Sequence, residues 1–197
     1  TNGQTSSRGF NVNVTCLDDA TSISLISTAN GEDNGVSYFN YNEDFGTQTL
    51  EFQLSDVDVQ HYAGVIQTGR HRYQDIEINV TSNNTDLVTI PLSSPPEITD
   101  DGAVTISFSS VANQSGEATL TITATDPNNP EDGSLSDSIN VLIKVGAVND
   151  TPVVEQISAQ SFNQGTSGQI NLNITDVEGD TIQDVAISTD GITYPEA

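Results

Sequence analysis

Alternation of apolar and polar residues with a period of two is the dominant pattern of the chain. Every second position is apolar, with Thr, Asn, Ser, Gln or Glu between, in six segments: residues 10–14, 50–54, 76–80, 104–108, 120–124 and 170–174. Successive side chains of a β-strand point to opposite faces, so this alternation predicts half-buried strands. No segment shows the 3.6-residue repeat of an amphipathic helix. The pattern therefore predicts an all-β chain.

Clusters of turn-forming residues separate the alternating segments. Residues 30–35, 93–96 and 127–133 are rich in Gly, Pro, Asn, Asp and Ser, which supply the backbone conformations and side-chain hydrogen bonds of turns. Many short strands separated in this way favour a β-sandwich.

An internal repeat predicts the domain plan. Residues 10–19 can be written in register with residues 141–150, and residues 54–58 with residues 174–178. We interpret the first pair as domain ends and the second as domain beginnings. Residues 1–20 are then the last strand of a preceding β-sandwich module, 21–149 a complete module, and 150–197 the N-terminal part of a following one. The expectation is a mature or excised segment of a longer tandem array.

The charge of the chain limits the classes of molecule that it can bind. The 197 residues include 28 Asp or Glu but only four Lys or Arg, which gives a formal net charge of -24. We expect no nucleic-acid binding, because so few basic side chains cannot neutralise a phosphate backbone. No apolar run approaches the roughly 20 residues of a membrane-spanning helix, so no membrane insertion is expected. Such acidity attracts divalent cations, although solvation at high salt is an alternative explanation.

Several motifs, taken in order, carry a family resemblance. They are residues 42–44, 54–58, 81–87, 116–126, 135–139 and 148–152, the last reading Val-Asn-Asp-Thr-Pro. This set resembles the tandem cadherin-like and immunoglobulin-like repeats of large bacterial surface adhesins, over most of residues 36–158. The resemblance implies tandem Greek-key β-sandwich modules, an extracellular or cell-surface location and a role in cell adhesion. Residues 176–182 also resemble the opening loop of a cadherin-like module.

The resemblance also implies calcium at the junctions between modules. Ca²⁺ takes six to eight hard oxygen ligands, which carboxylates, amides and backbone carbonyls supply. Carried over by motif, the second junction uses Glu43, Asn149, Asp150, Asp176 and Glu178. The first junction uses Asp18, Asp19, Asp56, Asp58 and Asp126.

The chain departs from the family pattern at both ends. The first linker reads Leu-Asp-Asp-Ala over residues 17–20, without the usual Asn-Asp and Pro, and Asn163 occupies the position that matches Glu43. A simpler alternative explains the same residues, because Asp and Asn are good turn-capping residues in any protein.

The sequence gives little support for catalysis, so we expect that the chain is not an enzyme. His61 and His71 are the only histidines, and neither a Gly-x-Ser-x-Gly elbow nor a His-Glu-x-x-His motif occurs. The single cysteine, Cys16, rules out an intrachain disulfide.

Residues 59–74 are unusual for so acidic a chain. The segment gathers basic and aromatic residues that carry binding energy in many interfaces, namely His61, Tyr62, Arg70, His71, Arg72 and Tyr73. We interpret it as a candidate contact with a ligand or partner. The alternative is that the two arginines pair with nearby acids and hold a long hairpin closed.

These observations together predict a structural or adhesive segment of an extracellular cell-surface or filament protein, built from tandem β-sandwiches stiffened by calcium. Its expected partners are neighbouring modules of the same or an identical chain, and a host, substrate or cell-surface ligand is a further candidate. One alternative is a recognition module that binds a peptide or glycan through residues 59–74. Another is a fibre subunit assembled by strand complementation, because the strands expected at 10–14, 170–174 and 182–187 have apolar faces without a cover of their own.

Overall fold

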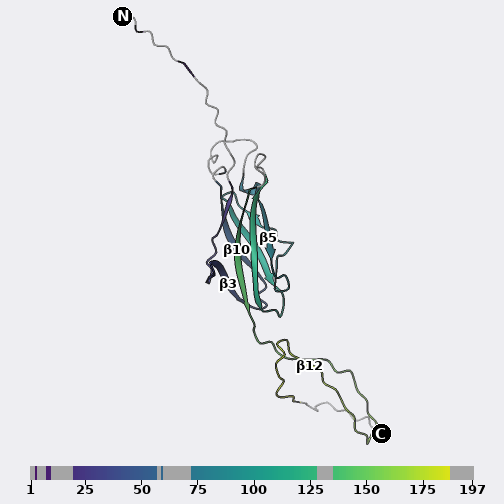
Figure 1. Cartoon of the computed structure of the whole chain (residues 1–197). Helices are drawn as coiled ribbons and strands as arrows, with labels where there is room; N and C mark the ends of the chain where they lie inside the picture. The colour runs from purple at the N-terminus through teal and green to yellow at the C-terminus, as the bar shows by residue number, and fades with distance from the viewer. Residues whose placement is uncertain are drawn as a thin grey trace. The chain divides into compact units, whose positions relative to one another are not determined.

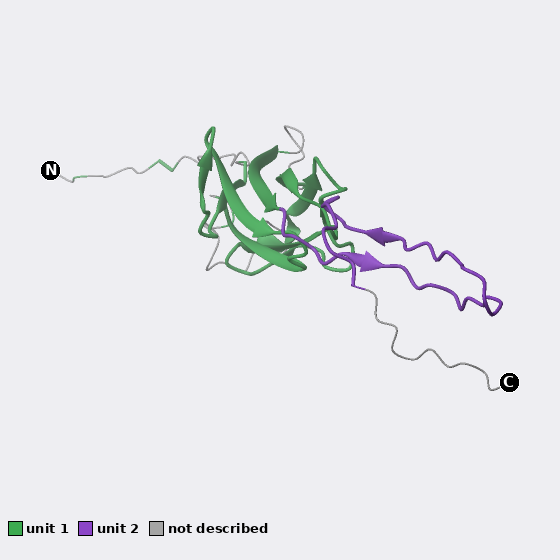
Figure 2. Cartoon of the chain, turned by 90° about the horizontal axis from the view of Figure 1, so that it is seen from below, with its two compact units in different colours: residues 1–146 green, residues 147–197 purple. Residues whose placement is uncertain are grey.

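The computed structural model describes residues 3, 8–9, 20–56, 59, 72–127 and 135–186. The chain divides into two compact units, unit 1 (1–146) and unit 2 (147–197), which Figure 2 shows in different colours. The described part of unit 1 holds ten strands and one short 3₁₀ helix, η1 (Tyr73–Asp75). The strands are β1 (Ser22–Leu25), β2 (Gly31–Asp33), β3 (Val36–Asn42), β4 (Thr47–Ser55), β5 (Glu77–Ser82), β6 (Val88–Thr89), β7 (Glu97–Ile98), β8 (Ala103–Ser110), β9 (Gly116–Asp126) and β10 (Leu135–Gly146).

Unit 1 is built from two five-stranded sheets. One sheet has the order β1-β4-β8-β6, with β7 also paired to β8, and the other has the order β2-β3-β10-β9-β5 (Figure 1). Among the described strands of unit 1 only β3 and β10 pair in parallel. The prediction of an all-β chain is therefore confirmed, and two sheets around one core are consistent with a β-sandwich.

The core of unit 1 comes from the inward-facing positions of the alternating segments. In β4 the side chains of Leu50, Phe52 and Leu54 are at most 1% exposed, whereas Glu51 between them is exposed. Strands β8, β9 and β10 contribute further buried residues to the same core, so both sheets cover it. Burial of one face of each sheet is the main source of stability in such a fold.

The four alternating segments that fall in the described part of unit 1 all correspond to strands. The predicted segments 50–54, 104–108 and 120–124 fall inside β4, β8 and β9. Strand β5 begins one residue later than predicted, because the N–H of Ile76 donates to the carbonyl oxygen of Tyr73 and caps η1. Residues 10–14 lie outside the described residues.

The predicted turn at residues 30–35 is only partly right. Gly31–Asp33 form β2, which pairs with β3, and the turn itself consists of Asn34 and Gly35. Their φ angles of 51° and 81° match the two-residue Asn-Gly hairpin turn, whose twist suits the flanking strands. The predicted turn at 93–96 is confirmed as a non-strand segment.

Unit 2 contains much less regular structure. Its described strands are β11 (Val153–Val154) and β12 (Ile174–Thr175), which pair antiparallel. The predicted strand at 170–174 is wrong except for Ile174, and residues 182–186 of the next predicted strand are not extended in a ladder either. Within the described part of unit 2 no second sheet covers the apolar side chains of the alternating segment, so these side chains have no sheet to pack against.

Candidate metal sites

The first candidate residue lies where unit 1 ends. Because β3 and β10 run parallel, with Asn42 opposite Gly146, both strands finish at the same end of the sandwich, which we call the Gly146 end. Glu43 follows β3 directly, and its backbone N–H donates to the carbonyl oxygen of Gly146 over 2.9 Å. Glu43 is also 9% exposed. The backbone of a largely buried glutamate is thus hydrogen-bonded to the last residue of unit 1.

The short connection between β3 and β4 holds Glu43 in position. Asp44 and Gly46 both have positive φ angles, and Asp44 Oδ1 accepts a hydrogen bond from the backbone N–H of Asn113 over 2.9 Å. The ring of Phe45 packs 4.6 Å from Tyr41 and 5.7 Å from Phe108, measured between ring centroids. Partial burial raises the pKa of Tyr41 above its usual 10.0.

The opposite end of unit 1 carries a second group of candidate residues. There β1 begins and β4 ends, with Ser22 opposite Ser55, and we call this the Thr21 end. The N–H of Ile23 donates to Asp137 Oδ2 over 3.0 Å, which places the start of β10 and the end of β9 at the same end.

Two aspartates at the Thr21 end are almost completely buried. Asp56 and Asp126 are each 1% exposed, and Thr21 between the linker and β1 is 0% exposed. Asp56 accepts hydrogen bonds from Thr21 Oγ1 at 2.5 Å and from the N–H of Val59 at 3.1 Å. Burial of an ionised carboxylate is costly unless donors or a cation compensate it. At Asp56 two donors, the Thr21 hydroxyl and the Val59 N–H, supply part of this compensation.

The remaining predicted ligands of the first junction, Asp18, Asp19 and Asp58, lie outside the described residues. Thr21 was not predicted as a site residue. Nothing in the sequence distinguishes it from the many other threonines, because its role depends on the end of β4, 35 residues away along the chain.

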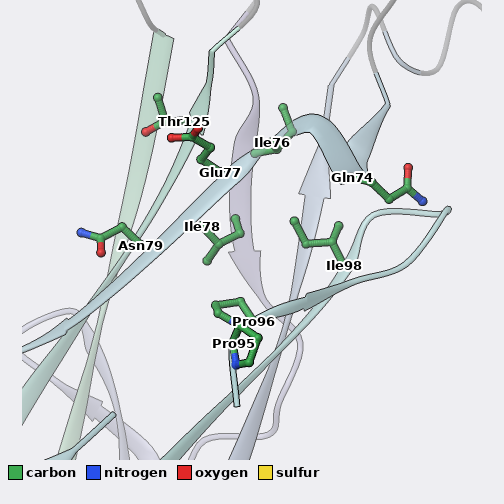
Figure 3. Close-up of a pocket in the computed structure, with 9 residues that line it drawn as sticks. All are labelled: Gln74, Ile76, Glu77, Ile78, Asn79, Pro95, Pro96, Ile98 and Thr125. Carbon is green, nitrogen blue, oxygen red and sulfur yellow. The ribbon is translucent and has the colours of Figure 1, made fainter. Parts of the chain in front are cut away.

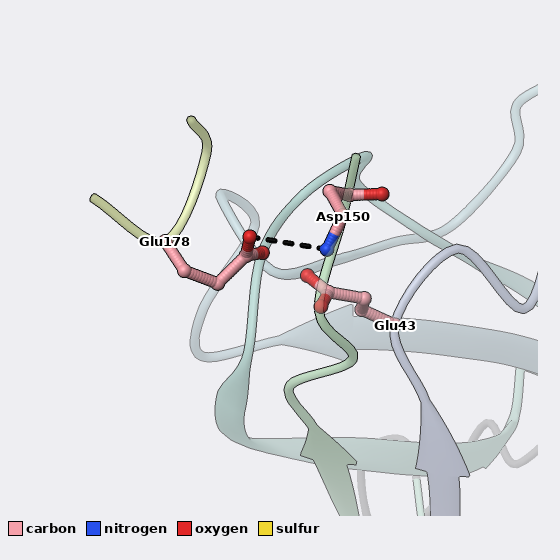
Figure 4. A group of neighbouring side chains, drawn as sticks. All are labelled: Glu43, Asp150 and Glu178. Atoms are coloured by element: carbon pink, nitrogen blue, oxygen red, sulfur yellow. Dashed lines mark hydrogen bonds between the residues drawn. The ribbon is translucent and has the colours of Figure 1, made fainter. Parts of the chain in front are cut away.

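In unit 2 the pairing of β11 with β12 brings residues 149–150, which precede β11, beside the acidic loop 176–180, which follows β12. Val153 lies opposite Thr175 and Val154 opposite Ile174. The same register, continued by three residues on each side, places Asp150 opposite Glu178. The N–H of Asp150 donates to Glu178 Oε2 over 3.1 Å (Figure 4). Carboxylate oxygens of Asp150 and Glu178 lie within 4.8 Å of each other. Glu43, which Figure 4 also draws, belongs to unit 1 and is described above.

The other predicted ligands of unit 2 shape the same loops. Asn149 Nδ2 donates to the carbonyl oxygen of Asp150 over 2.9 Å, and Asp176 Oδ1 accepts the N–H of Asp180 over 3.0 Å. These are capping contacts of the kind that Asn and Asp make in turns. They fix the backbone of both loops.

The predicted contact segment 59–74 is described only in part. His61, Tyr62, Arg70 and His71 lie outside the described residues, whereas Arg72 is exposed at the start of η1. Tyr73 is 5% exposed and belongs to the core, which disagrees with its expected role as a partner contact. Its ring lies 3.0 Å from where a Cβ would stand on Gly102, so glycine is needed there for close packing.

No helix among the described residues is long and apolar enough to span a membrane. Comparison with known protein families found no matching family, and comparison with curated proteins found no match either.

Proposed function

We propose that this chain is a structural or adhesive segment of an extracellular cell-surface or filament protein, in which Ca²⁺ stiffens the junctions between tandem β-sandwich modules. The observation that carries the proposal is the position of the buried carboxylates. Glu43 lies at the Gly146 end of unit 1, and Asp56 and Asp126 lie at the Thr21 end. Both ends are the places where a neighbouring module would join.

The strand order supports modules of the Greek-key immunoglobulin-like or cadherin-like type. In an immunoglobulin-like sandwich, strands A, B, E and D form one sheet and strands C, F and G the other. Taking β1, β4, β8 and the β6–β7 pair as A, B, E and D reproduces the first sheet. Taking β5, β9 and β10 as C, F and G reproduces the second, extended by β3.

Chain connectivity makes a shared ion at the Gly146 end feasible. Asp150 follows Gly146 by four residues, so it stays within about 14 Å of Gly146 whatever the orientation of the two units. Glu43 is hydrogen-bonded to Gly146, and Asp150 is hydrogen-bonded to Glu178. An ion that takes oxygens from Glu43, Asp150 and Glu178 would therefore restrict the motion of one unit relative to the other.

Calcium would also relieve charge repulsion. The chain has a formal net charge of -24, and like charges gathered near a junction disfavour the compact arrangement. A ligand bound only to the native state at one hundred times its Kd stabilises it by about 2.7 kcal/mol. We expect a melting temperature several degrees higher in millimolar Ca²⁺ than in chelator.

The test compares the full chain in Ca²⁺, in chelator and in NaCl of matched ionic strength, with ion binding measured by calorimetry. Asp150→Asn combined with Glu178→Gln is expected to abolish one tight Ca²⁺ site. The matched control, Glu51→Gln combined with Glu97→Gln, removes the same charge from exposed strand positions and should keep that site. Equal stabilisation by NaCl, or equal loss of Ca²⁺ binding in both double variants, would refute the proposed role of calcium.

A further inference from the structure

The outer edge of β5 differs from the other sheet edges of unit 1. At those edges β1 has four residues, β2 three, and β6 and β7 two each, with Pro91, Pro95 and Pro96 between β6 and β7. Short strands and prolines are common means of protecting an edge against strand addition. Strand β5 has six residues and contains no proline or lysine.

One edge of strand β5 carries backbone groups that no described strand uses. It pairs with β9 from Glu77 to Ser82, and no strand of the described residues pairs with its other edge. In an antiparallel pair only alternate residues exchange hydrogen bonds with the partner, so the remaining N–H and C=O groups of β5 point away from β9. These groups can form a ladder with one more extended strand.

A groove with an apolar floor lies beside this edge. It has a volume of about 700 Å³, and its apolar lining residues are Ile76, Ile78, Pro95, Pro96 and Ile98. Figure 3 shows Ile78 and Ile98 on either side of the open space, with Pro95 and Pro96 next to it. The size is within the roughly 300–1,000 Å³ range of ligand pockets. A strand added to β5 would place every second side chain over this floor.

The charge around the groove identifies the kind of partner. Glu77 lines it, Asp75 and Glu97 are sequence neighbours of lining residues, and Asp100 accepts a hydrogen bond from the lining residue Gln74. None of the lining residues is basic. On the solvent face of β5, Lys or Arg of an added strand would stand beside Glu77, and opposite charges in such cross-strand pairs are stabilising.

A second copy of the chain is a poor occupant. Each copy has a formal net charge of -24 and only four basic residues, so two copies repel each other at ordinary ionic strength. We propose instead that the β5 edge and its groove bind an extended segment of another protein, in which apolar residues alternate with Lys or Arg. None of the candidate calcium ligands lines this groove.

The test uses the full chain and a synthetic eight-residue peptide of alternating Val and Lys. Binding is measured by calorimetry at low and physiological salt, and the site by amide hydrogen exchange. We expect slower exchange within residues 77–82 on binding, and weaker binding as salt rises. The same peptide N-methylated at alternate residues keeps its charge but cannot form the ladder, and should bind about tenfold more weakly or worse. A peptide of alternating Val and Glu should not bind.

Protein variants separate the edge from general electrostatics. Ile78→Lys places a charge in the groove and should weaken binding at least about tenfold. Ser24→Lys, on the β1 edge, adds the same charge and should leave the affinity within about twofold. Glu77→Lys changes an exposed residue, which keeps the test valid if Ile78→Lys fails to fold, and should weaken binding by about three- to tenfold at low salt.

Four results would overturn the proposal. These are no binding up to about 1 mM peptide, equal binding of the N-methylated peptide, protection outside residues 77–82, and dimerisation of the unliganded chain through β5 in light scattering.

Discussion

The two units carry the same sequence pattern with opposite outcomes. Residues 50–54 and 170–174 both alternate apolar and polar side chains. In unit 1, Leu50 and Phe52 are 1% and 0% exposed, whereas in unit 2 Ile170 and Leu172 are 51% and 38% exposed. The difference lies in the neighbouring strands. Strand β4 pairs with two strands and faces a second sheet. In the described part of unit 2, β11 and β12 pair over only two residues each. Alternation thus specifies which face can be buried, and a second sheet is required to bury it.

The largest expected effect tests this comparison with one pair of leucines. Leu54→Ala removes a side chain that is 1% exposed in the core of unit 1, and should lower the free energy of unfolding by about 2–5 kcal/mol. Leu172→Ala removes an equal volume from unit 2 and should change it by less than about 0.5 kcal/mol. Urea unfolding of both variants measures the effect. Similar losses would mean that unit 2 has a packed core of its own.

The next effect concerns the polar contact at the Thr21 end. Thr21→Val keeps the shape of the side chain but removes the hydroxyl that donates to the buried Asp56. Loss of a donor to a buried carboxylate should cost about 1–3 kcal/mol. Thr151→Val, at an exposed position of unit 2, is the matched control and should be nearly neutral. An equal, small effect of both substitutions in urea unfolding would show that the buried contact contributes little.

A pair of glycines distinguishes backbone conformation from packing. Gly102 and Gly35, both in unit 1, have φ angles of 83° and 81°, but only at Gly102 would a Cβ meet other atoms, at 3.0 Å from Tyr73 and Gln53. Gly102→Ala should destabilise unit 1 by about 1–2 kcal/mol from the left-handed backbone alone, with crowding added to it. Gly35→Ala should destabilise unit 1 by about 1–2 kcal/mol from the backbone alone, without the crowding. Thermal unfolding of both variants would contradict the packing argument if their midpoints agree.

The smallest expected effect concerns Lys144, the only lysine of the chain. Its Nζ lies 2.7 Å from Asp33 Oδ2 and 3.4 Å from Glu117 Oε1, and the hydrogen bond to Asp33 is the main cause that raises the pKa of Lys144 above its usual 10.5. A raised pKa means that the folded state favours the charged amine. The stabilisation is therefore present below the unfolded-state pKa and is lost as pH rises through the folded-state pKa.

Lys144→Gln should accordingly lower the urea midpoint slightly at pH 8, and its difference from the unchanged protein should shrink above about pH 10.5. High salt should shrink the same difference, because the pair is near the surface. A difference that stays constant across both series would mean that packing of the aliphatic stem, and not charge, is responsible.

The sequence predicted which acidic residues could belong to a site, but only part of how they are arranged in space. The family resemblance implied Asp56, Asp150 and Glu178 as ligands, and the register of β11 with β12 does bring Asp150 and Glu178 together. The contribution of Thr21 was not predictable, since it depends on a contact with a residue far away in the sequence. For the same reason Tyr73 looked like an exposed contact residue, although the turn at Gly102 receives its ring in the core.

The sequence by itself determined the all-β class, the positions of β4, β8 and β9, and the acidic chemistry of the strand ends. These properties are local, because alternation and turn residues act within a few positions of the chain. The tertiary structure decided the parallel pairing of β3 with β10, the burial of Asp56 and Asp126, and the exposure of the apolar residues in unit 2. It also decided that no described strand pairs with the outer edge of β5. Each of these depends on which distant strand becomes a neighbour, and the period-two pattern is the same for every choice of neighbour.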